Sequence, residues 1–248
     1  MKFFLKSLIT YFYSLGPYKS EKKGFRALAY HSITNSKPNK DMWSVDKHSF
    51  KDHLSYIQEK KITVYDIDVL KNKIPDHGMS ITFDDGYRNN LEIAAPLLSE
   101  FEMPFSVFVI TDNLNESKKE YLDKVLLKEL SDNPLASIGS HSKTHARLTE
   151  CSPVQIRNEV RDSKLYLEDL LGKEVSAFSY PHGKFNSLVR EEVMKAGYIL
   201  GFTSHYDLNY IDQDKLTLNR NEIWNSDNLN SFKKKLDGHW DWLKYRKL

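Results

Sequence analysis

The sequence predicts an α/β fold built on a parallel sheet, either doubly wound or closed into a barrel. From Gly24 onward, short apolar stretches and amphipathic stretches alternate without a linker, a low-complexity segment or an internal repeat. Such alternation over about 220 residues is typical of parallel sheets, because each crossover between parallel strands needs a helix-length connection. The chain has 248 residues, of which 40% are hydrophobic and 28% charged, enough for one large domain.

The predicted strands are short apolar runs, and several of them stop at polar or glycine-containing segments. The run FSVFVI at 105–110 is typical of a strand buried on both faces. In chain order, the predicted strands are 25–30, 80–83, 105–110, 136–139, 177–180, 199–203 and 216–223.

The predicted helices follow from apolar spacing and from residues that start or stop helices. Phe50, Leu54 and Ile57 lie on one face of a predicted helix over 48–60. Pro153 opens a long helix that Gly172 stops, and Ser187 caps a helix that ends at Gly197. In chain order, the predicted helices are 48–60, 89–100, 121–130, 153–171, 187–197 and 229–243.

The composition argues against a nucleic-acid partner and against an intramolecular disulfide. The net charge is only +2 and the pI is about 8.3, so we expect no nucleic-acid partner. Cys151 is the one cysteine, so no intramolecular disulfide forms. This fits a reducing compartment without proving one, and no partner residue points to a nucleophilic role for Cys151.

Residues 1–23 form a segment of their own, a basic amphipathic stretch that precedes the domain at 24–248. Apolar residues at helical spacing alternate with lysines, a pattern suited either to a membrane surface or to packing on the domain or a second subunit. The run is too short to span a bilayer and has no small-x-small cleavage site. We therefore expect residues 1–20 to be retained in a protein that is cytoplasmic or peripheral at the inner membrane face. Export with an atypical signal segment is the alternative.

Two adjacent carboxylates, Asp84 and Asp85, follow the predicted strand at 80–83. Neighbouring residues at the end of a strand point in different directions, so one carboxylate can bind a metal while the other faces a water or a substrate. An acidic turn with both carboxylates in solvent would explain the same residues.

Two histidines, His141 and His145, follow the predicted strand at 136–139. Histidines four residues apart come to one side of a helical turn, within reach of one metal ion. Two surface histidines are the alternative for the pair alone. Together with one carboxylate, the pair forms a ligand set that leaves open positions for water and substrate.

The sequence resembles the polysaccharide deacetylases, which are carbohydrate esterases that remove N-acetyl groups. The resemblance covers about residues 25 to 225 and rests on three motifs in the same order and at the same spacing. These motifs are Thr82-Phe83-Asp84-Asp85-Gly86, His141-Ser142-Lys143-Thr144-His145 and Tyr180-Pro181-His182-Gly183. The resemblance implies a distorted (β/α) barrel, in agreement with the predicted alternation.

The resemblance also implies roles for individual residues. Asp84 would be the general base, and Asp85, His141 and His145 would hold one divalent metal ion, usually zinc. The backbone N–H of His182 would be the oxyanion donor.

Two residues of the family pattern are absent from their usual places. Ser179 stands where the third motif commonly begins with an arginine, and the usual histidine acid near the C-terminus is missing, since His239 lies in a helical, charged context. A circularly permuted branch that acts on β-1,6-linked N-acetylglucosamine polymers resembles this chain at both points. That resemblance implies His31 as the acid and Arg220 as the replacement arginine. A core histidine and a structural salt bridge are the respective alternatives.

The leading hypothesis is a metal-dependent hydrolase of an N-acetyl group on an N-acetylhexosamine-containing glycan or sugar intermediate, acting in surface polysaccharide biosynthesis. Tyr87 and Trp224 are candidates for stacking on sugar rings. An O-acetyl esterase, a small-amide hydrolase and a catalytically inactive carbohydrate-binding protein are the alternatives. The intact Asp84, Asp85, His141 and His145 argue against the last, because a binding module does not need that set.

Overall fold

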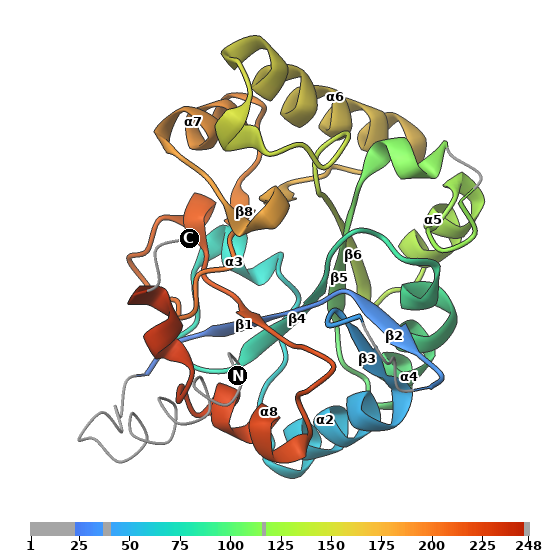
Figure 1. Cartoon of the computed structure of the whole chain (residues 1–248), viewed down its shortest axis with the longest axis vertical. Helices are drawn as coiled ribbons and strands as arrows, with labels where there is room; N and C mark the ends of the chain where they lie inside the picture. The colour runs from blue at the N-terminus through green and yellow to red at the C-terminus, as the bar shows by residue number, and fades with distance from the viewer. Residues whose placement is uncertain (1–22, 37–40, 116–117, 246–248) are drawn as a thin grey trace.

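A curved sheet of seven parallel strands occupies the centre of the computed structural model, which describes residues 23–36, 41–115 and 118–245 (Figure 1). The strand order β8-β7-β6-β5-β4-β1-β9 is parallel at every pairing, as the alternation predicts. The strands are β1 (Arg26–Tyr30), β4 (Met79–Phe83), β5 (Phe105–Val109), β6 (Ala136–Ser140), β7 (Ala177–Ser179), β8 (Leu200–Phe202) and β9 (Asn221–Glu222).

One segment near the C-terminus joins the two edges of this sheet. Leu218 bridges Phe202 beside β8, and its N–H donates to the Gly201 carbonyl at 2.7 Å. Asn221 then pairs with Leu28 of β1. The strand predicted over 216–223 is therefore wrong in its extent, because the chain must turn from one edge to the other: a 3₁₀ turn (Lys215–Thr217) comes first, and β9 has only two residues.

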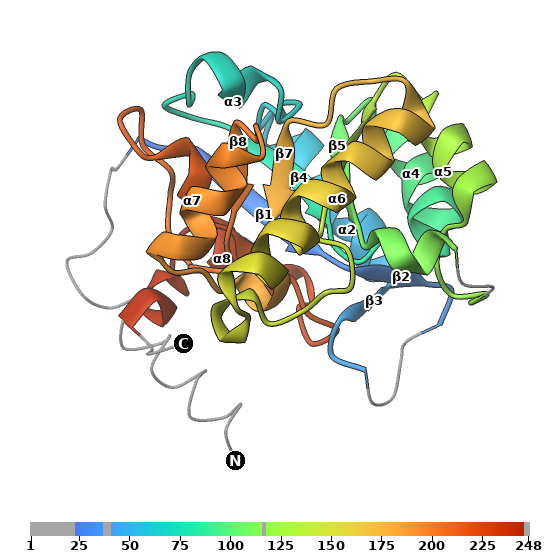
Figure 2. The same cartoon turned by 90° about the horizontal axis from the view of Figure 1, so that it is seen from above.

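Helices surround the outside of the sheet in Figures 1 and 2. Buried apolar side chains of the sheet and the helices form one large cluster, whereas a second cluster that contains Ala27, Phe108 and Phe202 fills the inside of the curve. The helices are α2 (Lys47–Glu59), α3 (Val69–Asn72), α4 (Ala95–Glu100), α5 (Lys124–Ser131), α6 (Pro153–Leu171), α7 (Ser187–Lys195) and α8 (Leu229–Leu236).

The ends of α6 confirm the prediction from sequence. Ser152 and Gln155 form a capping box at its start, and Gly172 adopts a left-handed φ of 64° at its end. The cap of α7 is Asn186, whose side chain accepts from the Val189 N–H, and not Ser187 as predicted.

Three other predicted elements differ from the structure. The helix expected over 89–100 begins as a π-helical turn (Asn90–Ala94), which α4 follows. The helix expected over 121–130 begins later, at the start of α5, where Asp123 is the N-cap. The helix expected over 229–243 breaks at Gly238, which has a φ of 78°, and ends in a 3₁₀ turn (Asp241–Tyr245). A small second sheet of β2 (Ser32–Thr34) and β3 (Ser44–Asp46) is not predicted.

The amphipathic segment expected at 1–23 lies almost wholly outside the described residues, which begin at residue 23. Within the described ranges, no helix is both long and apolar enough to cross a membrane.

Candidate metal centre and catalytic site

Asp84 and Asp85 leave β4 in different directions, as predicted. The Asp84 N–H still donates to the Tyr30 carbonyl of β1 at 2.9 Å, which keeps this residue in the sheet register. Asp85 instead adopts a left-handed φ of 72°, as does Gly86 after it. The two carboxylates nevertheless approach the same imidazole, because Asp84 Oδ2 lies 3.9 Å and Asp85 Oδ1 3.6 Å from His141 Nε2.

His141 and His145 lie in an irregular loop after β6, and not on a helical turn as predicted. Ser142 and His145 both have positive φ values, 65° and 63°, and the Ser142 hydroxyl accepts from the His145 N–H at 3.0 Å. These left-handed steps curl the loop so that the two imidazole rings approach to 4.8 Å between centroids.

Glu159 of α6 holds this loop in place. Its carboxylate accepts hydrogen bonds from the backbone N–H groups of Lys143 and Thr144, at 3.1 and 2.9 Å, and from the Thr144 hydroxyl at 2.7 Å. By accepting three hydrogen bonds, this one carboxylate helps to fix the conformation of the loop.

The structure brings the three expected metal ligands together. Asp85 Oδ1 lies 3.6 Å from His141 Nε2 and 3.7 Å from His145 Nε2, and the ligand atoms of all three lie within 4.8 Å of one another. Ligands bound to zinc at about 2.1 Å in a tetrahedron are about 3.4 Å apart, so this set needs little adjustment. His141 Nδ1 lies 2.8 Å from the Ser179 carbonyl, so it carries the proton and leaves Nε2 free to bind a metal.

The electrostatics of this set also fit a cation. Burial, together with the charge of Asp84, raises the pKa of Asp85 to about 7. Burial lowers the pKa of His141 to about 4 and that of His145 to about 3, so both rings are neutral at pH 7. Two neutral imidazoles and a carboxylate whose charge is poorly compensated are the donor set that a divalent cation would stabilise.

Arg220 forms a buried, bidentate ion pair with Asp84. Its two terminal nitrogens donate to the two carboxylate oxygens, each at 2.7 Å, and its side chain has no exposed area. Burial alone would raise the pKa of Asp84, but the charge and hydrogen bonds of Arg220 hold it well below the usual range. Ser179, which stands where the third motif commonly has an arginine, donates to Asp84 at 3.2 Å and accepts from Arg220 at 2.8 Å.

The rest of the Arg220 guanidinium is satisfied as well. Its Nε–H donates to the Thr203 carbonyl at 2.9 Å, and Nη1 donates to the Thr82 hydroxyl at 3.1 Å. The rings of Phe108 and Phe202 flank it, at 5.6 and 5.9 Å from ring centroid to guanidinium carbon. These contacts hold the guanidinium in one orientation against Asp84.

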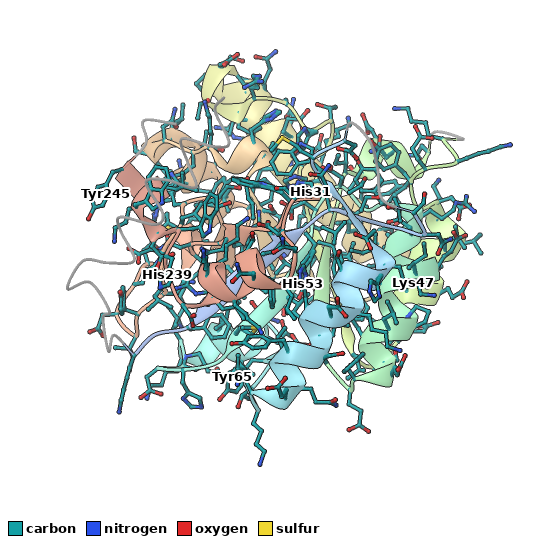
Figure 3. All side chains as sticks on the ribbon, turned by 60° about the horizontal axis from the view of Figure 1, so that its bottom comes forward. His31, Lys47, His53, Tyr65, His239 and Tyr245 are labelled. Carbon is teal, nitrogen blue, oxygen red and sulfur yellow. The ribbon has the colours of Figure 1, made fainter. Side chains whose placement is uncertain are left out.

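His31 faces the site and not the apolar core. It follows β1 beside Asp84, its side chain is partly exposed, and its ring packs 4.5 Å from Trp43. Burial lowers the pKa of His31 to about 4, while the charge of Asp84 raises it. Figure 3 shows His239, the other histidine considered as the acid, away from His31 in the C-terminal region.

His182 and the two aromatic candidates take different positions. His182 has a φ of 59°, hydrogen-bonds the His145 backbone and packs its ring 4.5 Å from the His145 ring. Tyr87 stacks on Tyr121 with 4.9 Å between ring centroids. Trp224 is only 6% exposed and lines a small cavity together with His182, but the Lys235 ammonium lies 3.9 Å from its ring. A stacked sugar would therefore find one face of Trp224 already covered.

Sequence reasoning missed the roles of Glu159 and Glu222. Glu159 contacts the histidine loop from a helix, and no local pattern signals this long-range contact. Glu222 lines the same cavity as Trp224. The signal for Glu222 was available, because two-residue alternation along the predicted strand places it on the same face as Arg220.

Comparison with known proteins identifies the family to which the chain belongs. The family model described as Polysaccharide deacetylase matches residues 71–201, more than half of the chain. YxkH of Bacillus subtilis (strain 168) is 28% identical over 199 residues, which cover 78% of this chain and 69% of that protein. The poly-β-1,6-N-acetyl-D-glucosamine N-deacetylase of Staphylococcus aureus (strain MSSA476) is 25% identical over 167 residues, which cover 62% of this chain and 54% of that enzyme.

Solved structures confirm the predicted distorted (β/α) barrel. The Streptococcus pyogenes deacetylase PplD in complex with acetate matches with a TM-score of 0.78 at 23% identity, over 86% of this chain and 97% of that one. IcaB from Ammonifex degensii matches with a TM-score of 0.76 at 19% identity, over 88% and 97% of the respective chains. At these identities the two likenesses establish the fold alone.

Proposed function

Because the chain belongs to the polysaccharide deacetylase family, we propose that it hydrolyses the N-acetyl group of an N-acetylhexosamine unit with the help of one divalent metal ion, zinc first among the candidates. The proposal rests on two adjacent carboxylates that lie in different environments. Asp84 is held ionised by Arg220, and next to it Asp85 closes a ligand set with His141 and His145.

In the proposed reaction, Asp85, His141 and His145 would hold the ion, which would polarise the amide carbonyl and lower the pKa of a water. Asp84 removes the proton of the attacking water as general base. Its ion pair with Arg220 keeps it ionised and fixes which way its oxygens point. The backbone N–H of His182 is the proposed donor to the developing oxyanion.

His31 is the proposed donor of a proton to the leaving amine. At pH 7 its ring is neutral in the free enzyme, because burial lowers its pKa to about 4. Negative charge that develops on the substrate beside the ring would raise this pKa and favour protonation when the amine leaves.

The substrate proposal rests on the relatives. The S. aureus relative is named for poly-β-1,6-N-acetyl-D-glucosamine, so a glycan or sugar intermediate that contains N-acetylglucosamine is the first candidate. The basic amphipathic residues 1–20 support a further proposal, that the enzyme contacts the inner face of the membrane during surface-polysaccharide synthesis.

The proposed function is tested by acetate release and metal content together. Wild-type protein should release acetate from N-acetylglucosamine oligomers and lose this activity on chelation. His141→Ala should bind less metal by elemental analysis and lose turnover, because a ligand is gone. A wild-type metal content in His141→Ala would contradict the assignment of the metal ligands. If wild-type protein released acetate only from O-acetylated sugars, the alternative of an O-acetyl esterase would be favoured.

His31→Ala should keep the metal and lose about 10²–10⁴-fold in kcat, the usual contribution of one positioned proton donor. The measurement is acetate release at saturating oligosaccharide, with elemental analysis of the same preparation. Partial recovery of kcat on addition of imidazole would support the proton-transfer role. An unchanged kcat would exclude His31 as the acid.

A further inference from the structure

A small cavity adjoins the candidate metal centre. Its lining includes His182, Tyr206, Glu222 and Trp224. His182 belongs to both places, because its ring also packs 4.5 Å from the ring of the metal ligand His145. A substrate whose acetamido group lies at the metal centre would thus have its neighbouring atoms at the mouth of this cavity.

The sheet register aims Glu222 at the catalytic side of the barrel. Glu222 pairs with Ala29 of β1, and Ala29 pairs on its other side with Thr82 of β4. Paired residues of parallel strands point to the same face, and every second residue shares that face. Glu222 therefore shares its face with Arg220 and Asp84, and the small Ala29 stands between Glu222 and Thr82.

The Glu222 carboxyl has acceptor capacity that its protein contacts do not use up. Burial raises the pKa of Glu222, while the neighbouring Ser204 side chain lowers it, and a carboxylate can accept about four hydrogen bonds. Three neighbouring cations have other carboxylate partners, and Lys244, which lines the same cavity, donates to Asp207 at 2.8 Å. Lys235 donates to Asp227 at 2.5 Å and to the Glu222 backbone carbonyl at 2.6 Å, and Arg220 is committed to Asp84.

We propose that Glu222 determines substrate specificity by accepting hydrogen bonds from hydroxyl groups of the hexosamine ring. This inference rests on the proposed function and extends it to a residue that recognises the sugar and not the acetyl group. Hydroxyl donors match a carboxylate acceptor that lies in the wall of a cavity.

The test compares Glu222→Gln with wild type on two substrates. An N-acetylglucosamine trimer carries the hydroxyl groups, and 4-nitrophenyl acetate does not. Glutamine keeps the shape but removes the charge and one acceptor oxygen. We expect kcat/KM for the trimer to fall about 10- to 100-fold, mainly through KM, with hydrolysis of 4-nitrophenyl acetate unchanged. Glu192→Gln is the matched control, because Glu192 is also buried but pairs with Arg157 on the helical side.

An equal loss on both substrates, or no loss on the trimer, would overturn the proposal. Trimer binding, followed by tryptophan fluorescence, separates this inference from the proposed function. If wild type releases no acetate but binds the trimer, and Glu222→Gln binds it about 10- to 100-fold more weakly, Glu222 recognises the sugar and the proposed deacetylase function fails. Equal binding by both proteins would overturn the role of Glu222 itself.

Discussion

Asp84→Asn is expected to lower kcat by at least about 10³-fold while leaving the metal ligands in place. Asparagine has nearly the shape of aspartate but cannot take a proton from water at neutral pH. Asp84 is not one of the three residues of the candidate ligand set, and its oxygens accept hydrogen bonds from Arg220 and Ser179. The loss should therefore appear in turnover and not in metal content.

To test this prediction, acetate release and metal content are measured on the same preparation of Asp84→Asn. Asp162→Asn serves as the control, because Asp162 is a partly exposed residue of α6 whose ion-pair partner is its neighbour Arg161. That variant should match wild type in both measurements. If Asp84→Asn retained more than about a tenth of the wild-type kcat, Asp84 would not be the general base. If it lost the metal as well, its carboxylate would be part of the ligand set.

The barrel could be predicted from sequence because its strands are short, strongly apolar runs separated by helix-length segments. β2 and β3 have three residues each, too few for a periodic signal, and β9 has two. Residues 216–223 are predicted as one strand. Their actual path depends on two different partners, β8 and β1, which local sequence does not specify.

The site was predictable where its residues come directly after strands. Asp84, Asp85 and His141 each follow a strand, so their proximity depends only on the order of strands in the sheet. The helical turn predicted for His141 and His145 was wrong because spacing alone does not reveal the left-handed residues of their loop. Glu159 depends on a contact between α6 and this loop, which only the tertiary structure supplies.

Removing Arg220 should be the most destabilising change at the site. Arg220→Met keeps most of the side-chain volume but leaves the Asp84 carboxylate buried without its cation, at 3% exposure. Breaking a buried ion pair from one side costs about 3–5 kcal/mol, so the free energy of unfolding should fall by about that amount. Urea unfolding with a chelator present measures this without a contribution from metal binding. Turnover should fall too, because Asp84 would lose the contacts that orient it.

The double variant Asp84→Asn/Arg220→Met separates the ion pair from simple packing. If the destabilisation of Arg220→Met comes from an uncompensated charge, neutralising Asp84 in the same protein should recover part of it, by about 1–3 kcal/mol. If it comes from lost packing against Phe108 and Phe202, the double variant should be no more stable than Arg220→Met alone. Should Arg220→Met fail to fold, Arg220→Lys is the second variant: it keeps the charge but cannot form the bidentate bond, and it should be less stable than wild type. Wild-type stability of Arg220→Lys would show that charge alone, without the two-point geometry, holds Asp84.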